Sequence, residues 1–266
     1  MTNKVASDKL PPGKVMRTNF FIEEMNQRFP RGENFTREQL LTFYKQFDPQ
    51  VKPGTFAWYL YILKKKHIIE HIQKGTYTIS GKPRFFPVPG KKIQKIDNAL
   101  KKNFAEVKYN LWTTGWLNEF TTHQQIKEIT ILEVEKDSLD SVFNNLRDNG
   151  FKNIFLKPDK TLMERYISEG SDAVVIKPAI SRSPVQLVKK IPVPTLEKIL
   201  VDIFCDEIIF YFYKGIELIN IYNYALKKYA LNLTMLFNYA GRRKREEALK
   251  AFMKEHLRPS LKGMIK

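Results

Sequence analysis

The hydrophobic pattern is most regular between Phe35 and Ser80, where two helix-like runs precede an alternating, strand-like run. Thr36 stands just before the first helical run and Gln39 follows three positions later, which is the pattern of a capping box. The apolar positions of this run are Leu40, Leu41, Phe43, Tyr44 and Phe47. Pro49 disfavours helical backbone in the residue before it, so the run predicts a short helix that ends near Asp48.

A second helix is predicted after the Pro53-Gly54 turn, with Thr55 as its N-cap. At about 100° per residue, its side chains divide into an apolar face and a mixed face. The apolar face consists of Phe56, Leu60, Leu63 and His67, with Tyr59 at its flank. The mixed face consists of Ala57, Trp58, Tyr61, Lys64 and Lys65. We expect the first face to pack on its domain and the second to be exposed.

Two further apolar runs, 68–72 and 76–79, flank Lys74-Gly75 and predict a β-hairpin. Together with a helix over residues 17–29, these elements are typical of a winged helix-turn-helix, whose second paired helix enters the DNA major groove. We therefore predict a DNA-binding domain over residues 17–80. Its candidate DNA contacts are Lys52, Thr55, Ala57, Trp58, Tyr61, Lys64, Lys65 and Lys74. Because this face carries no Arg–Asn pair, contacts to phosphate are favoured over base reading.

The rest of the chain alternates strand-like and helix-like runs. The pattern predicts an α+β protein, in which a winged helix-turn-helix precedes a mixed α/β domain with a helical C-terminal part. Residues 1–16 are expected to form a flexible tail, 81–92 a linker and 93–266 the mixed effector domain. Phe85 and Phe86 indicate that the linker packs on the protein. The expected strands are 108–113, 129–134, 153–157, 173–177 and 185–193. The expected helices are 91–104, 139–148, 162–167, an amphipathic helix over 195–205 capped by Thr195, 216–229, 233–240 and 244–256.

The composition points to a polyanionic partner. The 266 residues carry 45 Lys and Arg against 28 Asp and Glu, a formal charge of +17. The N-terminal 95 residues hold 18 of these basic residues and 7 of the acidic ones, so the excess is concentrated at the predicted winged helix. Nucleic acid is the commonest polyanion that such a charge serves.

Cys205 is the single cysteine, which excludes a disulfide framework and a zinc site made of cysteines. It lies in an apolar helical run and is expected to be a small buried side chain. A single free thiol fits a reducing cytoplasm. The chain has no apolar stretch of membrane-spanning length and no apolar signal region, so we expect a cytoplasmic protein that does not contact a membrane.

Acidic residues near Glu133 raise the alternative of a metal-dependent nuclease. Glu133 and Glu135 share one face of a predicted strand, and Lys136 follows them, so these groups could hold a cation and position water. The usual nuclease arrangement has an acidic residue two positions before the lysine, where this chain has Val134. A solvated strand edge is therefore the favoured interpretation, and we expect no catalytic residue, metal or cofactor.

Two cationic segments lie outside the winged helix. The loop over residues 180–184 contains Arg182, and the segment before the last helix contains Arg242, Arg243, Lys244 and Arg245. These residues are candidates for secondary anion contacts. Cations at the start of the last helix would oppose the helix dipole, and a polyanion or an acidic partner would compensate for that cost.

The order of several segments resembles one known family. The segments are KKKHIIEHIQKGTYTI, LWTTGWLNEF, ILEVEKDSLDSVFNNL, IKPAISRSPVQ and VPTLEKILVDIFCD. Between Glu33 and Glu247 the chain is similar to the AbiEi-like antitoxins and transcriptional regulators of type IV, or abortive infection, toxin–antitoxin systems. The resemblance implies a non-enzymatic protein that binds double-stranded operator DNA, represses its own operon and opposes a nucleotidyltransferase-like toxin. The chain departs from the family at Ala57 and Tyr59, where relatives often carry basic residues. A nuclease and a winged-helix adaptor that binds protein are the alternatives.

Overall fold

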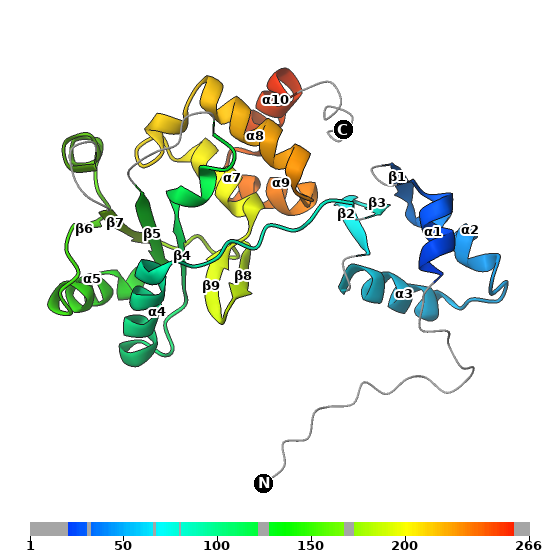
Figure 1. Cartoon of the computed structure of the whole chain (residues 1–266), viewed down its shortest axis with the longest axis horizontal. Coiled ribbons are helices and arrows are strands. Elements are labelled where there is room, and N and C mark those ends of the chain that lie inside the picture. Colours follow the sequence, from blue (N-terminus) through cyan, green and yellow to red (C-terminus); the bar gives the residue numbers. More distant parts are fainter. Residues whose placement is uncertain are drawn as a thin grey trace, which may run out of the picture.

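The computed structural model describes residues 21–30, 33–65, 68–79, 81–121, 128–167 and 173–257. The chain has mixed α+β structure, as predicted. A smaller N-terminal part and a larger part built on a four-stranded sheet are joined by an extended segment (Figure 1). The tail predicted over residues 1–16 lies outside the described residues. In the described part of the chain, none of the helices combines the length and apolar character needed to span a membrane.

The N-terminal part combines three helices with a small antiparallel sheet. Its elements, in order, are α1 (Ile22–Arg28), β1 (Asn34–Thr36), α2 (Arg37–Lys45), α3 (Pro53–Lys65), β2 (Ile69–Gln73) and β3 (Thr76–Ile79). The sheet has the order β1-β3-β2, and Gly75 closes the predicted hairpin with a φ of 75°. Strand β1 was not predicted, because three residues are too few to show alternation.

The two helix starts had different outcomes. The capping box of α2 is confirmed: the Gln39 backbone N–H donates to Thr36 Oγ1 at 3.2 Å, and the Thr36 N–H donates to Gln39 Oε1 at 2.7 Å. The N-cap role of Thr55 is wrong, because α3 already begins at Pro53. Proline is well suited to the first helical position, where its missing N–H would have no partner within the helix.

The core of the N-terminal part agrees with the apolar face assigned to the second helix. Phe56, Leu60 and Leu63 are buried and pack with residues of α1 and α2. His67 lies outside the described residues. Phe47 is partly exposed, and its ring stacks on that of Phe21 with the centroids 4.1 Å apart.

The larger part is organised around a sheet of order β4-β5-β7-β6, in which β5, β7 and β6 are parallel and β4 is antiparallel. The strands of this sheet are β4 (Tyr109–Thr113), β5 (Ile129–Val134), β6 (Ile154–Leu156) and β7 (Ala173–Pro178). A separate two-stranded sheet is formed by β8 (Val185–Val188) and β9 (Ile191–Pro194). The α-helices of the larger part are α4 (Lys91–Asn103), α5 (Leu139–Asp148), α6 (Lys160–Leu162), α7 (Leu196–Cys205), α8 (Ile216–Lys228), α9 (Leu233–Arg242) and α10 (Glu246–His256). Short turns complete it: η1 (Thr114–Leu117), η2 (Lys136–Ser138), the π-helical η3 (Met163–Ile167) and η4 (Tyr211–Tyr213).

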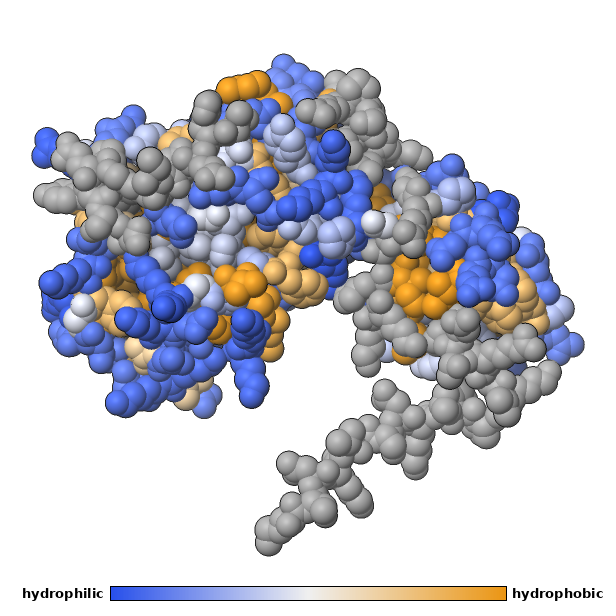
Figure 2. Space-filling view, in the orientation of Figure 1, coloured by the Kyte–Doolittle hydropathy of each residue, from blue (hydrophilic) through white to orange (hydrophobic). Residues whose placement is uncertain are grey.

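The two faces of this sheet are covered by different helices. Leu132 and Ile176 on one face pack with α4 and α5, whereas Ile131 and Val175 on the other pack with α7 and the C-terminal helices. The alternation follows from the two-residue period of a strand. On the face shown in Figure 2, hydrophilic side chains cover α4, in agreement with the exposure of its lysines.

Two elements of the larger part differ from the prediction. The single strand expected over residues 185–193 is a hairpin of β8 and β9, because Lys189 and Lys190 turn the chain with φ values of 49° and 66°. Left-handed backbone is uncommon for lysine, so this turn could not be predicted from residue type. The helix expected to be amphipathic, α7, is buried along its length from Leu196 to Phe204. Thr195 precedes it but makes no side-chain cap hydrogen bond.

The segment between the two parts packs on the larger one, as Phe85 and Phe86 indicated. Phe85 is buried beside the rings of Trp116, Phe120 and Tyr229, while Phe86 is exposed. The backbone N–H of Ala230 donates to the Pro83 carbonyl at 3.1 Å. These contacts hold the connecting segment against the C-terminal helices.

Candidate functional site: a cationic surface and a buried charge network

The mixed face of α3 reaches the surface in part. Ala57 and Lys64 are exposed, and Tyr61 has 55% of its surface exposed. Trp58 is half-buried and packs against the core, with its ring 5.8 Å from that of Tyr59. Its assignment to the exposed mixed face is therefore only partly correct. Of the residues before this face, Lys52 is exposed and Thr55 is half-buried. The side chain of Lys65 lies outside the described part of the structure.

The hairpin brings further cations to the same region. Lys74 is exposed at the hairpin turn, and Lys64 Nζ lies 5.9 Å from the centre of the Tyr77 ring on β3. Arg37, which the sequence analysis did not single out, is exposed at the start of α2. Its backbone N–H donates to the Gly75 carbonyl at 2.9 Å, and its guanidinium carbon lies 5.0 Å from the Phe56 ring centre. Arg37 therefore joins the cationic surface, which we define as Arg37, Lys52, Lys64 and Lys74.

His71 on β2 borders this surface. Burial lowers the pKa of its imidazole, and the positive charge of Lys64 lowers it further. The ring lies 5.4 Å from that of Tyr77. The imidazole is thus held neutral at neutral pH, and the positive charge of the surface comes from lysine and arginine.

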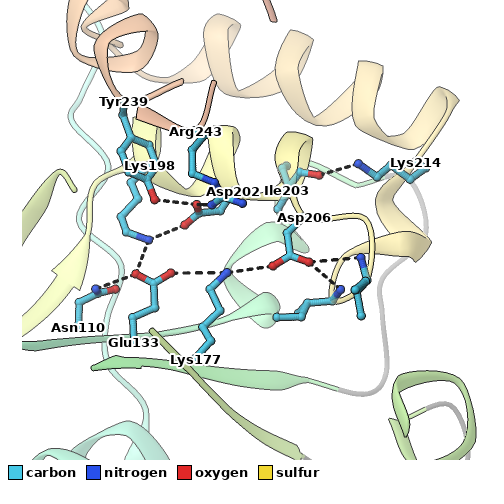
Figure 3. Close-up of polar contacts among 12 residues, drawn as sticks. Asn110, Glu133, Lys177, Lys198, Asp202, Ile203, Asp206, Lys214, Tyr239 and Arg243 are labelled. Carbon is cyan, nitrogen blue, oxygen red and sulfur yellow. Dashed lines mark hydrogen bonds and ion pairs between the residues drawn. The ribbon is translucent and has the colours of Figure 1, made fainter. Parts of the chain in front are cut away.

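The larger part contains a network of buried charges between its sheet and α7 (Figure 3). Lys198 Nζ lies 2.7 Å from Glu133 Oε2 on β5, and it also forms an ion pair with Asp202 one turn along α7. All three side chains are fully buried. The polar stripe of α7 therefore faces the sheet and not solvent, which is why the amphipathic pattern was misleading.

Further residues extend the network at both ends. The residues are Asn110, Lys177, Asp206, Tyr239 and Arg243. The Asn110 side-chain amide donates to Glu133 Oε2 at 3.0 Å, and the Tyr239 hydroxyl donates to Asp202 Oδ1 at 2.8 Å. Arg243 pairs with Asp202 at 2.7 Å, and Lys177 lies 3.1 Å from Asp206 and 3.7 Å from Glu133. Three cations thus meet three carboxylates, so the network is electrically balanced.

The pKa shifts follow from this balance. Burial alone would lower the pKa of Lys198, but the charges of Asp202 and Glu133 outweigh it and raise that pKa. Burial alone would raise the pKa of Asp202, but Lys198, Lys177 and Arg243 outweigh it and lower that pKa. The charged forms are therefore the stable ones inside the protein, as expected for buried ions that are paired and hydrogen-bonded.

The sequence prediction of a solvated edge at Glu133 is wrong, because β5 is an inner strand and Glu133 is fully buried. Glu135 lies outside this network, with Oε1 3.8 Å from Lys108 Nζ, and Lys136 is exposed. The three residues of the nuclease alternative are thus not gathered into one site. Within the described residues, no group of three His, Cys, Asp or Glu side chains is arranged to hold a metal ion.

Of the predicted secondary anion contacts, Arg243 is half-buried and pairs with Asp202. The others, Arg182, Arg242, Lys244 and Arg245, are exposed. Arg242 donates to Ser181 Oγ at 3.3 Å, and Arg245 lies 3.6 Å from Glu207. Because α9 extends through Arg242 and Arg243 caps it, Arg242 and Arg243 lie at the C-terminal end of α9. Cations are favourable there, so the expected opposition to a helix dipole is wrong for this pair.

The network predicts how stability depends on pH. Because the folded pKa of Asp202 is lowered, its contribution is present above the unfolded pKa of about 3.9 and is lost as the pH falls through the folded value. Because the pKa of Lys198 is raised, its contribution is present below about 10.4 and is lost as the pH rises through the folded value. Urea unfolding should therefore show lower midpoints in acid below about pH 4. Asp202→Asn should flatten this acid limb, and an unchanged acid limb in that variant would contradict the assignment.

The chain matches the model of a family of unknown function, DUF6577, over residues 55–259. It belongs to this family. The DUF6577 match begins within α3 and covers the hairpin, the sheet and the C-terminal helices, so it includes the buried charge network. No curated protein matches the chain.

Proposed function

We propose that this DUF6577 protein is a transcriptional regulator whose N-terminal part is a winged helix-turn-helix that binds double-stranded DNA. The order α1, β1, α2, α3, β2, β3 supports the proposal, because α2 and α3 then form the helix pair and β2–β3 the wing. The sheet order β1-β3-β2 places the wing beside β1, which directly precedes α2. In this arrangement α3 is the helix that enters the major groove.

The cationic surface is the observation that carries the proposal. Lys64 and Lys52 on or beside α3, Lys74 on the wing and Arg37 on α2 are all exposed on the part of the chain that holds most of the positive excess. Such cations release counterions when they contact phosphate, which supplies most of the affinity of non-specific DNA binding. Ala57 and Tyr61 offer apolar contact to base edges but no bidentate hydrogen bonds, so phosphate contacts position the protein more than they specify sequence.

The resemblance to AbiEi-like antitoxins extends the proposal. On this view the DNA is the operator of the protein's own operon, and the larger part opposes a nucleotidyltransferase-like toxin encoded beside it. The chain itself performs no reaction and needs no cofactor. This extension rests on the order of the sequence segments, whereas the DNA-binding proposal also has the support of the exposed cations.

A gel-shift measurement with the DNA upstream of its own gene tests the proposal. Retardation is expected at about 50 mM salt, and a protein making about six phosphate contacts should lose roughly 10³-fold in affinity at about 200 mM salt. A fragment of equal length and shuffled sequence is the control for operator preference. If neither fragment is retarded at the lower salt concentration, the proposal is wrong.

A further inference from the structure

The β8–β9 hairpin leaves one edge of its small sheet open. The Thr195 backbone N–H donates to the Pro184 carbonyl at 3.1 Å, which fixes the alternation of hydrogen-bonded pairs along the hairpin. By this alternation, the backbone N–H and C=O groups of Val185 and Leu187 point away from β9. Among the described residues, no other backbone group forms a hydrogen bond with these two.

The two edges of the hairpin differ in residue type. The residues of β9 opposite Val185 and Leu187 are Pro194 and Pro192, which have no N–H to donate at the outer edge of β9. Proline at such positions prevents a further strand from forming a full ladder there. On β8 the outward N–H groups are retained. The edge of β8, which we define by Val185 and Leu187 and call the open edge, can therefore accept another strand.

The side chains at the open edge are apolar and exposed. Leu187 has 70% and Val185 has 41% of its surface exposed, whereas Val188 packs against the core of the larger part. Because residues two apart share one face of a strand, Leu187 and Val185 form a single apolar strip. Figure 2 shows hydrophobic side chains over β8 and β9 and hydrophilic ones at the tip of the hairpin. A strand that pairs with the open edge would cover this strip with its own apolar side chains.

The charges near the open edge all have the same sign. Arg182 precedes β8, Lys189 and Lys190 follow it, and residues 180–190 include no acidic residue. All three cations are exposed, and in the described part of the structure none of their side chains forms a hydrogen bond or an ion pair. Antiparallel pairing of β8 with β8 of a second copy would bring Arg182 close to the lysines of the other copy, which is unfavourable. The charges therefore favour a partner strand with acidic ends over a second copy of the chain.

We propose that the open edge binds an extended acidic segment of a partner protein, which adds a third strand to the β8–β9 sheet. The backbone groups of Val185 and Leu187 pair with the backbone of this segment, and its apolar side chains pack on the strip. Its acidic ends meet Arg182 on one side and the lysines of the hairpin turn on the other. The open edge belongs to the larger part of the chain, so the interaction does not depend on DNA binding by the N-terminal part.

Calorimetric titration of the full-length chain with the peptide DEVTVTVED tests the binding. This peptide has valines at alternate positions and acidic residues at both ends. A dissociation constant of about 0.1 mM is expected at about 50 mM salt, because the ladder is short. The peptide KKVTVTVKK has the opposite charges and should bind at least about tenfold more weakly. Absence of saturable binding up to about 2 mM, or equal binding of the two peptides, would overturn the proposal.

Substitution of Leu187 tests the role of the backbone. Leu187→Pro removes the outward N–H and repeats on β8 what Pro192 does on β9, so the ladder between the two strands is kept. It should weaken binding of the acidic peptide by about tenfold or more, because a carbonyl of the peptide loses its donor. Leu187→Val keeps the N–H and an apolar side chain and should bind within about twofold of the unchanged protein. Equal binding by the proline variant contradicts the assignment of the open edge.

Reversal of charge at the hairpin turn provides a second test. The double variant Lys189→Glu with Lys190→Glu should lose the preference for the acidic peptide over the basic one. Lys227→Glu with Lys254→Glu makes the same change of net charge at exposed positions on α8 and α10, and it should keep that preference. If the turn variant keeps the preference as well, the proposal is wrong even where Leu187→Pro does not fold.

Amide hydrogen exchange measured by NMR gives the direct readout. In the free protein the N–H groups of Val185 and Leu187 should exchange quickly, whereas β9 protects those of Gln186 and Val188. A saturating concentration of the acidic peptide should slow exchange at the first two by about tenfold or more and leave the second two unchanged. Slower exchange only at residues outside β8 would place the peptide elsewhere and contradict the proposal. None of these measurements contains DNA, so a negative gel shift does not affect them.

Discussion

A protein carrying both Lys64→Glu and Lys74→Glu should retain its fold and lose most of its affinity for DNA. Both lysines are exposed, one on α3 and one at the hairpin turn, so their charges are not needed inside the protein. Loss of two phosphate contacts should reduce the slope of log affinity against log salt by about 2. Because each substitution also introduces repulsion, a loss of affinity of about 100-fold or more is expected at low salt. Gel shifts over a series of salt concentrations measure both quantities.

The control for this prediction changes the same charge at other places. Lys227→Glu with Lys254→Glu alters two exposed lysines on α8 and α10, so the net charge of the chain changes equally. If the two double variants lose affinity to the same extent, the overall charge of the protein and not the cationic surface accounts for binding. Circular dichroism of all variants establishes that each one is folded.

Lys198→Met should be the most destabilising single substitution in the buried charge network. It removes the ammonium that Glu133 and Asp202 share, so the three carboxylates of the network are left with two cations, Lys177 and Arg243. Removing one partner from a buried ion pair typically costs about 3–5 kcal/mol, a large fraction of the free energy of unfolding of an ordinary domain. Urea or thermal unfolding of the purified variant should show this loss, or the variant should fail to accumulate in folded form.

Lys108→Met provides the matched comparison, because the Lys108–Glu135 pair lies on the surface with the charged atoms 3.8 Å apart. Exposed pairs contribute about 0–1 kcal/mol, so the unfolding midpoint of this variant should be close to that of the unchanged protein. A second comparison tests whether the loss comes from unpaired charge. Adding Glu133→Gln to Lys198→Met should recover part of the stability, since two carboxylates then face the two remaining cations, Lys177 and Arg243. If Lys198→Met and Lys108→Met lower the free energy of unfolding by equally small amounts, the buried ion pairs do not stabilise the protein.

The cationic surface was partly predictable because its elements are local. The α3 positions that are exposed follow from a period of 3.6 residues, and Lys74 follows from the position of Gly75 in a two-residue turn. Arg37 was missed because its place near the hairpin depends on the contact between α2 and the Gly75 carbonyl, which is a contact across 38 positions of sequence. The half-burial of Trp58 was missed because a helical period does not give the width of the buried face.

Most strands and helices of the larger part, the capping box of α2 and the apolar face of α3 could be predicted from local sequence, because each depends on neighbours within a few residues. The surroundings of Lys198 and Asp202, in contrast, depend on how distant segments pack together. Their spacing of four fits an exposed ion pair on a helix equally well, and nothing local distinguishes a stripe that faces water from one that faces a sheet. Burial of α7 between the sheet and α8 and α9 removes that stripe from water, and Glu133 on β5 then supplies the compensating charge.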